Sequence, residues 1–377
     1  ERNPAAIRTA IDGWKKNNDV VGIVGPVFSD EVSSAAEASN SSHIPLLSPT
    51  AMENGLAEKS KFVFLMNSDF SMRGKLMAQY AIKNLHYISF AILSPETSPS
   101  KLIADAFIEE TKRLGATIVS DYRYFKGAMD LRHVFRSLRN DASVYGTDYQ
   151  ISFVRKFQYA DMLSKLVTAG VSPFFADSLL AARKPVSVKI LFGNDGKKIA
   201  DSLGIPLQKV SIPPDSLNYS IHSIDAIFCP IASSAEIGVI TSQLTYYNLE
   251  SQLLGTSEWG DMNELDINKR YADGVIFFAD RWYEENERYT QLAVRFVRRN
   301  KKTLNDNIIF GYDAMSLLLH QTITSREQCE EVLQKVSHYE GIRSKISFTQ
   351  GRINSHLHIL QFKKGKIHKI GEVEYQQ

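Results

Sequence analysis

Short apolar segments alternate with amphipathic segments along the first 142 residues, and this alternation restricts the fold more than any other feature. Segments with the composition of strands lie at residues 20–25, 43–48, 62–66, 87–93 and 117–124, and the first four are mainly apolar. The segments between them have helical spacing and lie at residues 4–14, from Ser29 onward, and at 71–85, 101–114 and 130–139. Strands and helices in this order predict right-handed βαβ units, a parallel sheet and the α/β fold class.

Local signals support several of these boundaries. Asn3 is suited to cap the first helix, with Pro4 at its first helical position. The turn at Gly25 and Pro26 leads to Ser29, which is followed by two acidic residues, as at the start of a helix. Residues 20–25 are continuously apolar, which is typical of a strand buried on both faces of a parallel sheet.

The second half of the chain has a less regular pattern. Residues 145–182 are interpreted as mainly helical, residues 185–192 as a strand and residues 197–203 as a short helix. Regular alternation then returns: strands are expected at 224–230, 252–255 and 274–278, and helices from Ser234 and at 289–299, 312–322 and 327–338. Residues 356–362 and 366–372 predict a terminal hairpin around Lys364 and Gly365.

Composition excludes several classes of protein. The 377 residues favour two domains, and 44% hydrophobic with 23% charged residues is ordinary for a globular protein. A formal net charge of +2 gives no reason to expect a nucleic-acid partner. Cys229 and Cys329 have no metal-binding spacing. The sequence has no G-x-S-x-G, H-E-x-x-H or G-x-G-x-x-G motif, so we expect neither an enzyme nor a bound cofactor.

Several blocks, in order, resemble the leucine/isoleucine/valine-binding family of type I periplasmic binding proteins. They are residues 20–26 (VVGIVGP), Ser29, residues 44–50 (IPLLSPT), 224–230 (IDAIFCP), 253–259 (LLGTSEW), 271–277 (YADGVIF) and 311–314 (GYDA). The resemblance covers about residues 4–142 and 223–370. It implies an extracytoplasmic receptor that captures an amino acid or similar small polar ligand and passes it to the membrane subunits of an ABC transporter. A lipoprotein, anchored by lipid, is one form that such receptors take.

The resemblance also implies a Venus-flytrap architecture, in which two doubly wound parallel-sheet lobes close around ligand by a hinge. Lobe one is expected at residues 1–86 and 279–342, and lobe two at 87–278 and 343–377. Residues 143–222 have no counterpart in the family and are interpreted as an insertion into lobe two. Family members begin with a strand, a helix and a strand before the segment at Pro4, so the first strands of lobe one are expected to be missing.

Candidate ligand contacts follow from strand ends, because open α/β sheets bind ligands outside the carboxyl ends of their strands. In lobe one these are Ser29, at a helix start that suits a carboxylate, and Ser48, Thr50 and Ala51. Ser29 could equally be a helix cap, and residues 48–51 an ordinary turn. Relatives that bind amino acids have a threonine at Met52 for the ammonium, and Met52 cannot accept such a hydrogen bond.

In lobe two the candidates are Ser98, in the turn that also holds Ser94 and Glu96, together with Ser233 and Glu258. Glu258 matches, with a shift of one residue, an acid that pairs with the ligand ammonium in some relatives. It could instead cap a helix, and Trp259 beside it could form an apolar wall.

Three other features of the sequence have alternative interpretations. The block at 255–259, the insertion and Met52 also resemble the lipoprotein that activates penicillin-binding proteins, so an envelope protein is an alternative partner. His356 and His358 share a strand face, with His368 across the hairpin; a solvated strand face is favoured over a zinc site. The turn Gly193-Asn194-Asp195-Gly196-Lys197-Lys198 lacks the P-loop pattern and is interpreted as an ordinary turn.

Overall fold

The computed structural model describes residues 3–146, 148–153, 158–183, 185–210, 217, 219–282, 287–320, 322–343, 345–349 and 351–376. The chain divides into two compact units, and each is described by itself. Unit 1 comprises Glu1–Leu76, Ala279–His358 and Gly371–Gln377, and unit 2 comprises Met77–Phe278 and Ile359–Ile370. Among the described residues, no helix combines the length and the apolar character needed to cross a bilayer.

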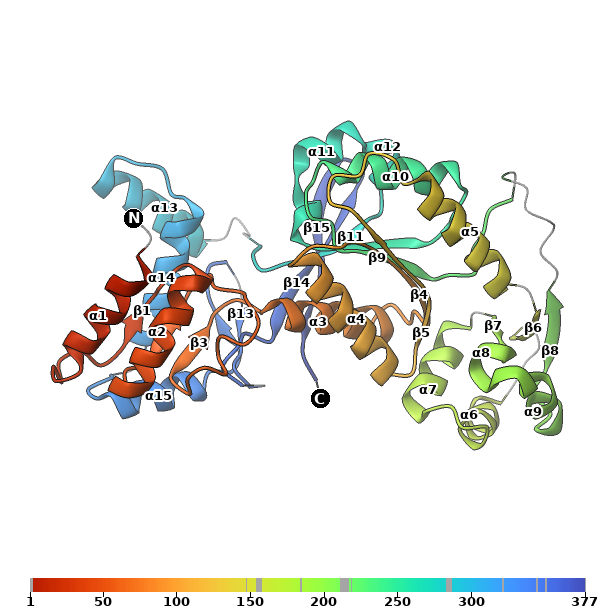
Figure 1. Ribbon diagram of the computed structural model, residues 1–377, viewed down its shortest axis with the longest axis horizontal. Helices are drawn as coiled ribbons and strands as arrows, with labels where there is room; N and C mark the ends of the chain where they lie inside the picture. Colours follow the sequence, from red (N-terminus) through yellow and green to blue (C-terminus); the bar gives the residue numbers. More distant parts are fainter. Residues whose placement is uncertain are drawn as a thin grey trace. The chain divides into compact units, whose positions relative to one another are not determined.

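Unit 1 is built around a three-stranded parallel sheet of order β1-β2-β3 (Figure 1). Its strands and helices are β1 (Ile23–Val24), β2 (Leu46–Ser48), β3 (Val63–Leu65), β12 (Tyr339–Glu340), β13 (Lys345–Ile346), α1 (Pro4–Trp14), α2 (Ser29–Ser42), the start of α3 (Phe70–Lys83), α13 (Glu287–Asn300), α14 (Asp306–Leu319) and α15 (Arg326–Gln334). Asn3 caps α1 as expected, since its side chain accepts the amide N–H of Ala6 at 3.0 Å.

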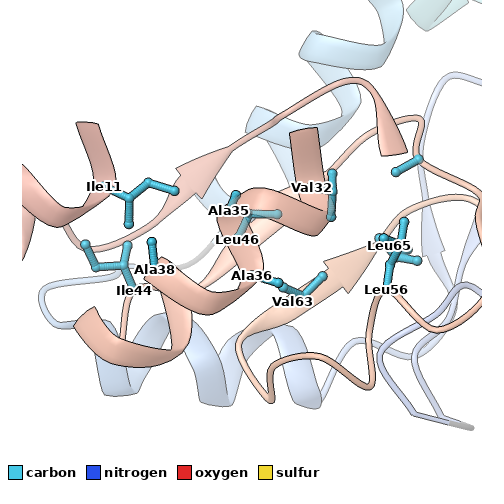
Figure 2. Close-up of a cluster of buried hydrophobic side chains, with 11 residues drawn as sticks. Ile11, Val32, Ala35, Ala36, Ala38, Ile44, Leu46, Leu56, Val63 and Leu65 are labelled. Carbon is cyan, nitrogen blue, oxygen red and sulfur yellow. The ribbon is translucent and has the colours of Figure 1, made fainter. Parts of the chain in front are cut away.

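The unit 1 sheet is covered on both faces. Leu46, Val63 and Leu65 point toward α1 and α2, where they join a buried cluster with Ile11 and Val32 (Figure 2). The alternate residues of the same strands pack on the opposite face, in a cluster with residues of α14 and α15; they are Leu47, Phe64 and Met66. Successive strand residues point to opposite faces, and both faces of this sheet are covered by helices, so both sets of residues are apolar. This explains the continuous apolar runs in the sequence.

Unit 2 contains a seven-stranded sheet of order β15-β14-β11-β10-β9-β4-β5. Its strands are β4 (Ser89–Pro95), β5 (Thr117–Tyr124), β9 (Ala226–Cys229), β10 (Gln252–Gly255), β11 (Ile276–Ala279), β14 (His356–Lys363) and β15 (Lys366–Glu374). The last residue of β11, the first residues of β14 and the last residues of β15 fall within unit 1. The helices along this part of the chain are α4 (Ser100–Arg113), α5 (Arg132–Gly146), α10 (Glu236–Tyr246), the short η2 (Ser257–Gly260), α11 (Met262–Ile267) and α12 (Lys269–Ala272). Strands β5, β4, β9, β10 and β11 pair in parallel, as the alternation of segments predicted.

The middle of unit 2 forms a small subdomain with its own three-stranded antiparallel sheet, of order β7-β6-β8. Its elements gather in one part of unit 2 (Figure 1) and are β6 (Asp148–Ile151), α6 (Tyr159–Thr168), α7 (Pro173–Ala182), β7 (Val186–Ser187), α8 (Val188–Phe192), η1 (Gly193–Asp195), α9 (Gly196–Ser202) and β8 (Leu207–Val210). The helical interpretation of residues 145–182 was therefore right for α6 and α7 but missed β6.

The strand expected over residues 185–192 is wrong beyond its first residues. Only Val186 and Ser187 pair with β6, and the chain then turns into α8. Periodicity cannot separate a short apolar strand from a buried helical segment, and here packing decides. Gly196 lies so close to this helix that a Cβ there would stand 2.2 Å from the carbonyl oxygen of Val188. The helical turn is therefore held against α9 by a contact that only glycine permits.

The expected hairpin is present, but the solvated face expected at His356 and His358 is wrong. These side chains belong to unit 1 and are 6% and 4% exposed. His356 Nε2 lies 3.3 Å from Glu372, which also accepts from Lys345 at 2.6 Å. Because histidine is polar, the sequence suggested a face exposed to solvent. The fold instead buries both rings beside the Glu372 carboxylate, which offsets part of the cost of burying them.

Burial of His356 predicts a pH-dependent stability. Desolvation lowers the pKa of His356 below its ordinary value near 6.5, and Lys345 acts in the same direction, while Glu372 and Glu374 oppose it. The unfolded chain therefore binds this proton more readily, so stability falls as pH drops below about 6.5 and this group contributes nothing above it. When the pH is lowered from neutral to mildly acidic, the thermal midpoint of His356→Gln should fall by on the order of 2 °C less than the thermal midpoint of the parent protein. An equal decrease of the thermal midpoint in the two proteins would contradict the assignment of this pH dependence to His356.

Candidate ligand-binding site

Two turns of unit 1 are joined at the carboxyl ends of β1 and β2. The Ser48 hydroxyl donates to the carbonyl of Pro26 at 2.6 Å, and the Thr50 hydroxyl donates to the carbonyl of Val27 at 2.5 Å. In return, the amide N–H of Met52 donates to the Ser29 hydroxyl at 3.2 Å. The structure therefore brings together the three hydroxyl-bearing residues that the sequence singled out in this part of the chain.

These residues differ in what they present to solvent. Ser48 and Ala51 are 0% and 1% exposed, so their side chains hold the turn from inside. Ser29 and Thr50 are half-buried. The alternative role of Ser29 as a helix cap is wrong, because α2 begins at Ser29 itself and Phe28 occupies the cap position. Phe28, as the cap residue, makes no side-chain hydrogen bond to the helix, whereas the Asp30 carboxylate accepts the amide N–H of Glu31 at 3.0 Å. The Ser29 hydroxyl binds the neighbouring turn instead.

Sequence reasoning missed two apolar residues at this edge. Val27 and Phe28 lie in the turn between β1 and α2 and are 45% and 41% exposed. An exposed aromatic ring beside a helix start can pack against the apolar part of a ligand. Their position directly after a buried strand and before Ser29 was the signal that could have identified them.

Two buried arginines of unit 1 support the second turn from behind. Arg343 is 1% exposed and donates to the carbonyl of Pro49 at 2.8 Å and to Asn67 at 3.1 Å. Arg73 is 3% exposed; it contacts the sulfur of Met52 and forms a 2.7 Å ion pair with Asp280. Neither arginine was anticipated, because residues that support a turn from distant parts of the chain leave no local pattern.

The unit 2 candidates lie at the carboxyl ends of three neighbouring strands. Ser98 follows β4, Ser233 follows β9 and Glu258 follows β10 within the short helix η2. Ser98 and Glu258 are exposed, and Ser233 is half-buried. The Glu258 carboxylate accepts only from its neighbour Ser257, at 3.3 and 3.4 Å, among the hydrogen bonds of the described residues. These side chains share one edge of the sheet, but no hydrogen bond joins them to one another in the described part of the chain.

Beneath this edge, unit 2 is closed by buried side chains. Trp259 is 0% exposed and its indole N–H donates to the carbonyl of Cys229 at 2.8 Å, so the expectation that it forms a ligand wall is wrong. The indole packs directly against Gly255, where a Cβ would stand 2.2 Å from the ring, so only glycine permits this contact. The Tyr124 hydroxyl donates to Glu236, and burial raises the pKa of both groups.

The fold is α/β with turns joined at the carboxyl ends of its strands, and comparison with known proteins identifies its class. A family model described as periplasmic binding protein matches residues 1–190, half of the chain. This protein belongs to the periplasmic binding protein family, whose members bind small molecules outside the cytoplasm. Comparison with curated protein sequences gave no match.

Solved structures share the fold at low sequence identity. A protein described as a branched-chain amino acid ABC transporter, from Rhodospirillum rubrum, has a TM-score of 0.68 at 14% identity, over 98% of this chain and 85% of its own. The substrate-binding protein LivJ from Streptococcus pneumoniae, in complex with isoleucine, has a TM-score of 0.52 at 14% identity, over 100% and 85%. A solute-binding protein from Rhodopseudomonas palustris, in complex with 3,4-dihydroxybenzoic acid, has a TM-score of 0.52 at 12% identity, over 100% and 84%.

Proposed function

We propose that this protein is an extracytoplasmic receptor that captures a small carboxylate with an apolar body and delivers it to an ABC importer. The observation that carries the proposal is the pair of joined turns in unit 1. They set the N-terminus of the 14-residue helix α2, the Thr50 hydroxyl and the exposed Phe28 ring at one edge of the sheet. First-turn amides and the helix dipole favour an anion, and the ring suits an apolar group.

The ligands of two structural relatives support a carboxylate. Isoleucine and 3,4-dihydroxybenzoic acid, each bound to a different relative, share a carboxylate and an apolar body but not an ammonium group. In this chain Met52 presents a thioether where an ammonium would need a stronger acceptor, and the carbonyl of Thr50 already accepts from Asn67 at 3.3 Å. We therefore propose that recognition depends on the carboxylate more than on an ammonium.

In unit 1, Ser29 and Thr50 are proposed to line the carboxylate subsite, with Ser48 and Ala51 holding the turn behind them. In unit 2, Ser98, Ser233 and Glu258 are proposed as ligand contacts. Solute-binding receptors of this class are not enzymes, and we propose no reaction for this chain. The comparisons lend no support to the envelope-regulator alternative, and lipid anchoring remains a prediction.

The subsite is tested by calorimetric titration with isoleucine, 3,4-dihydroxybenzoate and the amide of isoleucine. We expect the two carboxylates to bind and the amide to bind weakly. Ser29→Ala should weaken carboxylate binding by about 10-fold or more, because a hydrogen bond to a charged group contributes about 1.5–3 kcal/mol. Thr50→Val should weaken it indirectly, because it removes the hydrogen bond to the Val27 carbonyl that joins the two turns.

The matched control is Ser41→Ala, an exposed serine near the other end of α2 whose hydroxyl donates to its own helix. It should leave affinity unchanged. Binding of isoleucine amide as tightly as isoleucine would contradict the carboxylate subsite, and failure of every small carboxylate to bind would contradict the proposed function as a whole.

A further inference from the structure

The helix α13 (Glu287–Asn300) differs from two helices of unit 1 that have the same length, because none of its residues is buried. The helices α2 and α14 also have 14 residues, and each buries several side chains, among them Val32 and Leu317. Helix α13 lies at the periphery of unit 1 (Figure 1). Since packing of an apolar face supplies most of the stability of a short helix, α13 has apolar surface that its own fold leaves partly uncovered.

The apolar residues of α13 lie on adjoining parts of its surface. Leu292 and Phe296 are four positions apart, as are Ala293 and Val297, so each pair lies on one side of the helix. Leu292, Ala293 and Phe296 are half-buried. Val294 and Val297 are each 44% exposed. The helix therefore has the amphipathic pattern of a helix that buries one face, but two of its aliphatic side chains face solvent.

Positive charge is concentrated at the C-terminal half of α13 and directly after it. Five exposed side chains form what we call the basic cluster: Arg295, Arg298, Arg299, Lys301 and Lys302. In the part of the chain that the structure describes, none of these five side chains forms an ion pair or a hydrogen bond with a carboxylate. Residues 287–302 contain six basic residues and one acidic residue, whereas the formal net charge of the whole chain is only +2.

The helix dipole accounts for only part of the basic cluster. Cations in the last turn of a helix are stabilised by its dipole, and Arg298 and Arg299 occupy that turn. The effect falls off within one turn, however, and Lys301 and Lys302 lie beyond the end of the helix. The cluster therefore has a net attraction for anions that no group in the described part of unit 1 satisfies.

A helix that combines unpaired cations with uncovered aliphatic side chains matches the surface of an anionic bilayer. Lipid phosphates attract the cations, and the boundary between headgroups and acyl chains accepts the aliphatic side chains. An acidic protein surface would supply the negative charge but would place carboxylates beside Val294 and Val297, which gain nothing from them. The bilayer satisfies both features of the helix at once, so the combination favours a lipid surface over an acidic protein.

We propose that α13 binds the surface of a bilayer that contains anionic phospholipid. The basic cluster contacts lipid phosphates, and Val294 and Val297 enter the boundary between headgroups and acyl chains. The binding is peripheral and reversible, because two valines bury too little apolar area to anchor the chain. This inference goes beyond the proposed function and does not depend on whether the protein binds a carboxylate.

The test is co-sedimentation of the full chain with phosphatidylcholine vesicles, with and without about 30% phosphatidylglycerol. We expect binding to the anionic vesicles, little binding to the neutral ones, and release as salt rises from about 0.05 M to about 0.5 M, because salt screens exposed charges. Lys301→Gln combined with Lys302→Gln should weaken binding by about 10- to 30-fold, since each cation near an anionic surface strengthens it about 5-fold. Val297→Ser should weaken it by about 2- to 5-fold, because it removes apolar area that the bilayer buries.

The matched control is Lys15→Gln combined with Lys16→Gln. These two lysines of unit 1 are exposed and directly follow α1, just as Lys301 and Lys302 are exposed and directly follow α13. The control removes the same charge and should leave binding to the anionic vesicles unchanged. An equal loss of binding in the two double variants would overturn the assignment to α13, because it would show attraction by the net charge alone.

Two further outcomes would also overturn the proposal. Equal binding to neutral and anionic vesicles would show that the basic cluster contributes nothing. No binding to anionic vesicles would exclude the bilayer and would leave an acidic protein surface as the occupant of α13. All four lysines lie outside helices and strands, so these variants should fold like the parent protein, and circular dichroism checks that they do.

Discussion

Replacing Arg343 with methionine should lower the free energy of unfolding by about 3 kcal/mol and weaken ligand binding at the unit 1 turns. The guanidinium donates to the carbonyl of Pro49 and to Asn67, and it stacks on Phe310 with 4.1 Å to the ring centroid. Methionine keeps much of the volume but leaves buried acceptors without donors, which costs about 1–3 kcal/mol for each. Urea denaturation measures the change in the free energy of unfolding, and calorimetric titration with isoleucine measures the change in ligand affinity.

Two further variants give this prediction its controls. Arg343→Lys should recover only part of the stability, because an ammonium cannot reproduce the planar donor fork or the stacking on Phe310. Arg295→Met, on the exposed surface of α13, should change stability by less than about 0.5 kcal/mol. If Arg343→Met were as stable as Arg295→Met, the support that we assign to Arg343 would be wrong.

The second large effect is expected at Trp259. Trp259→Ala should destabilise the protein by about 3–5 kcal/mol, because it removes a fully buried aromatic side chain and leaves a cavity. Trp259→Phe keeps most of the packing but leaves the carbonyl of Cys229 without the indole N–H, so its expected cost is about 1–2 kcal/mol. Chemical denaturation of the two variants separates packing from hydrogen bonding.

The matched control for this pair is Trp14→Phe on α1, where the indole is 40% exposed. It should change stability by less than about 0.5 kcal/mol. A cost for Trp259→Phe no larger than that of Trp14→Phe would show that the indole N–H contributes nothing. A ligand affinity that collapses in Trp259→Phe without loss of stability would instead restore the ligand-wall role that its burial argues against.

Most elements of the main sheets could be predicted from the sequence, because their signals are local. Parallel strands buried on both faces are continuously apolar, as in β9, where residues 226–229 read AIFC and are all buried. Helix starts are marked by residues such as Asn3, whose side chain caps the first turn, and Pro4, whose ring suits the first helical position. The subdomain was less predictable, because its short elements, such as β7 and α8, have too few residues to show a period.

The candidate site was predictable only in part. Strand ends in an α/β sheet are identifiable from the sequence, so Ser29, Ser48 and Thr50 could be named before the structure showed them joined. The residues that support them from behind could not be named. Arg343 reaches Pro49 across 294 positions of sequence, and its role exists only when both segments pack together.

Local patterns in the sequence predicted the α/β class, the parallel strand pairing and the carboxyl ends of the strands, because hydrophobic period and turn chemistry act over a few neighbouring residues. Burial and pairing over long distances came from the tertiary packing. It placed Trp259 and the two histidines inside, and it brought Arg343 to the turn at Pro49 from a distant segment of the sequence. The physical reason is that burial changes the free energy of a polar or aromatic side chain according to what surrounds it, and those surroundings come from the whole fold.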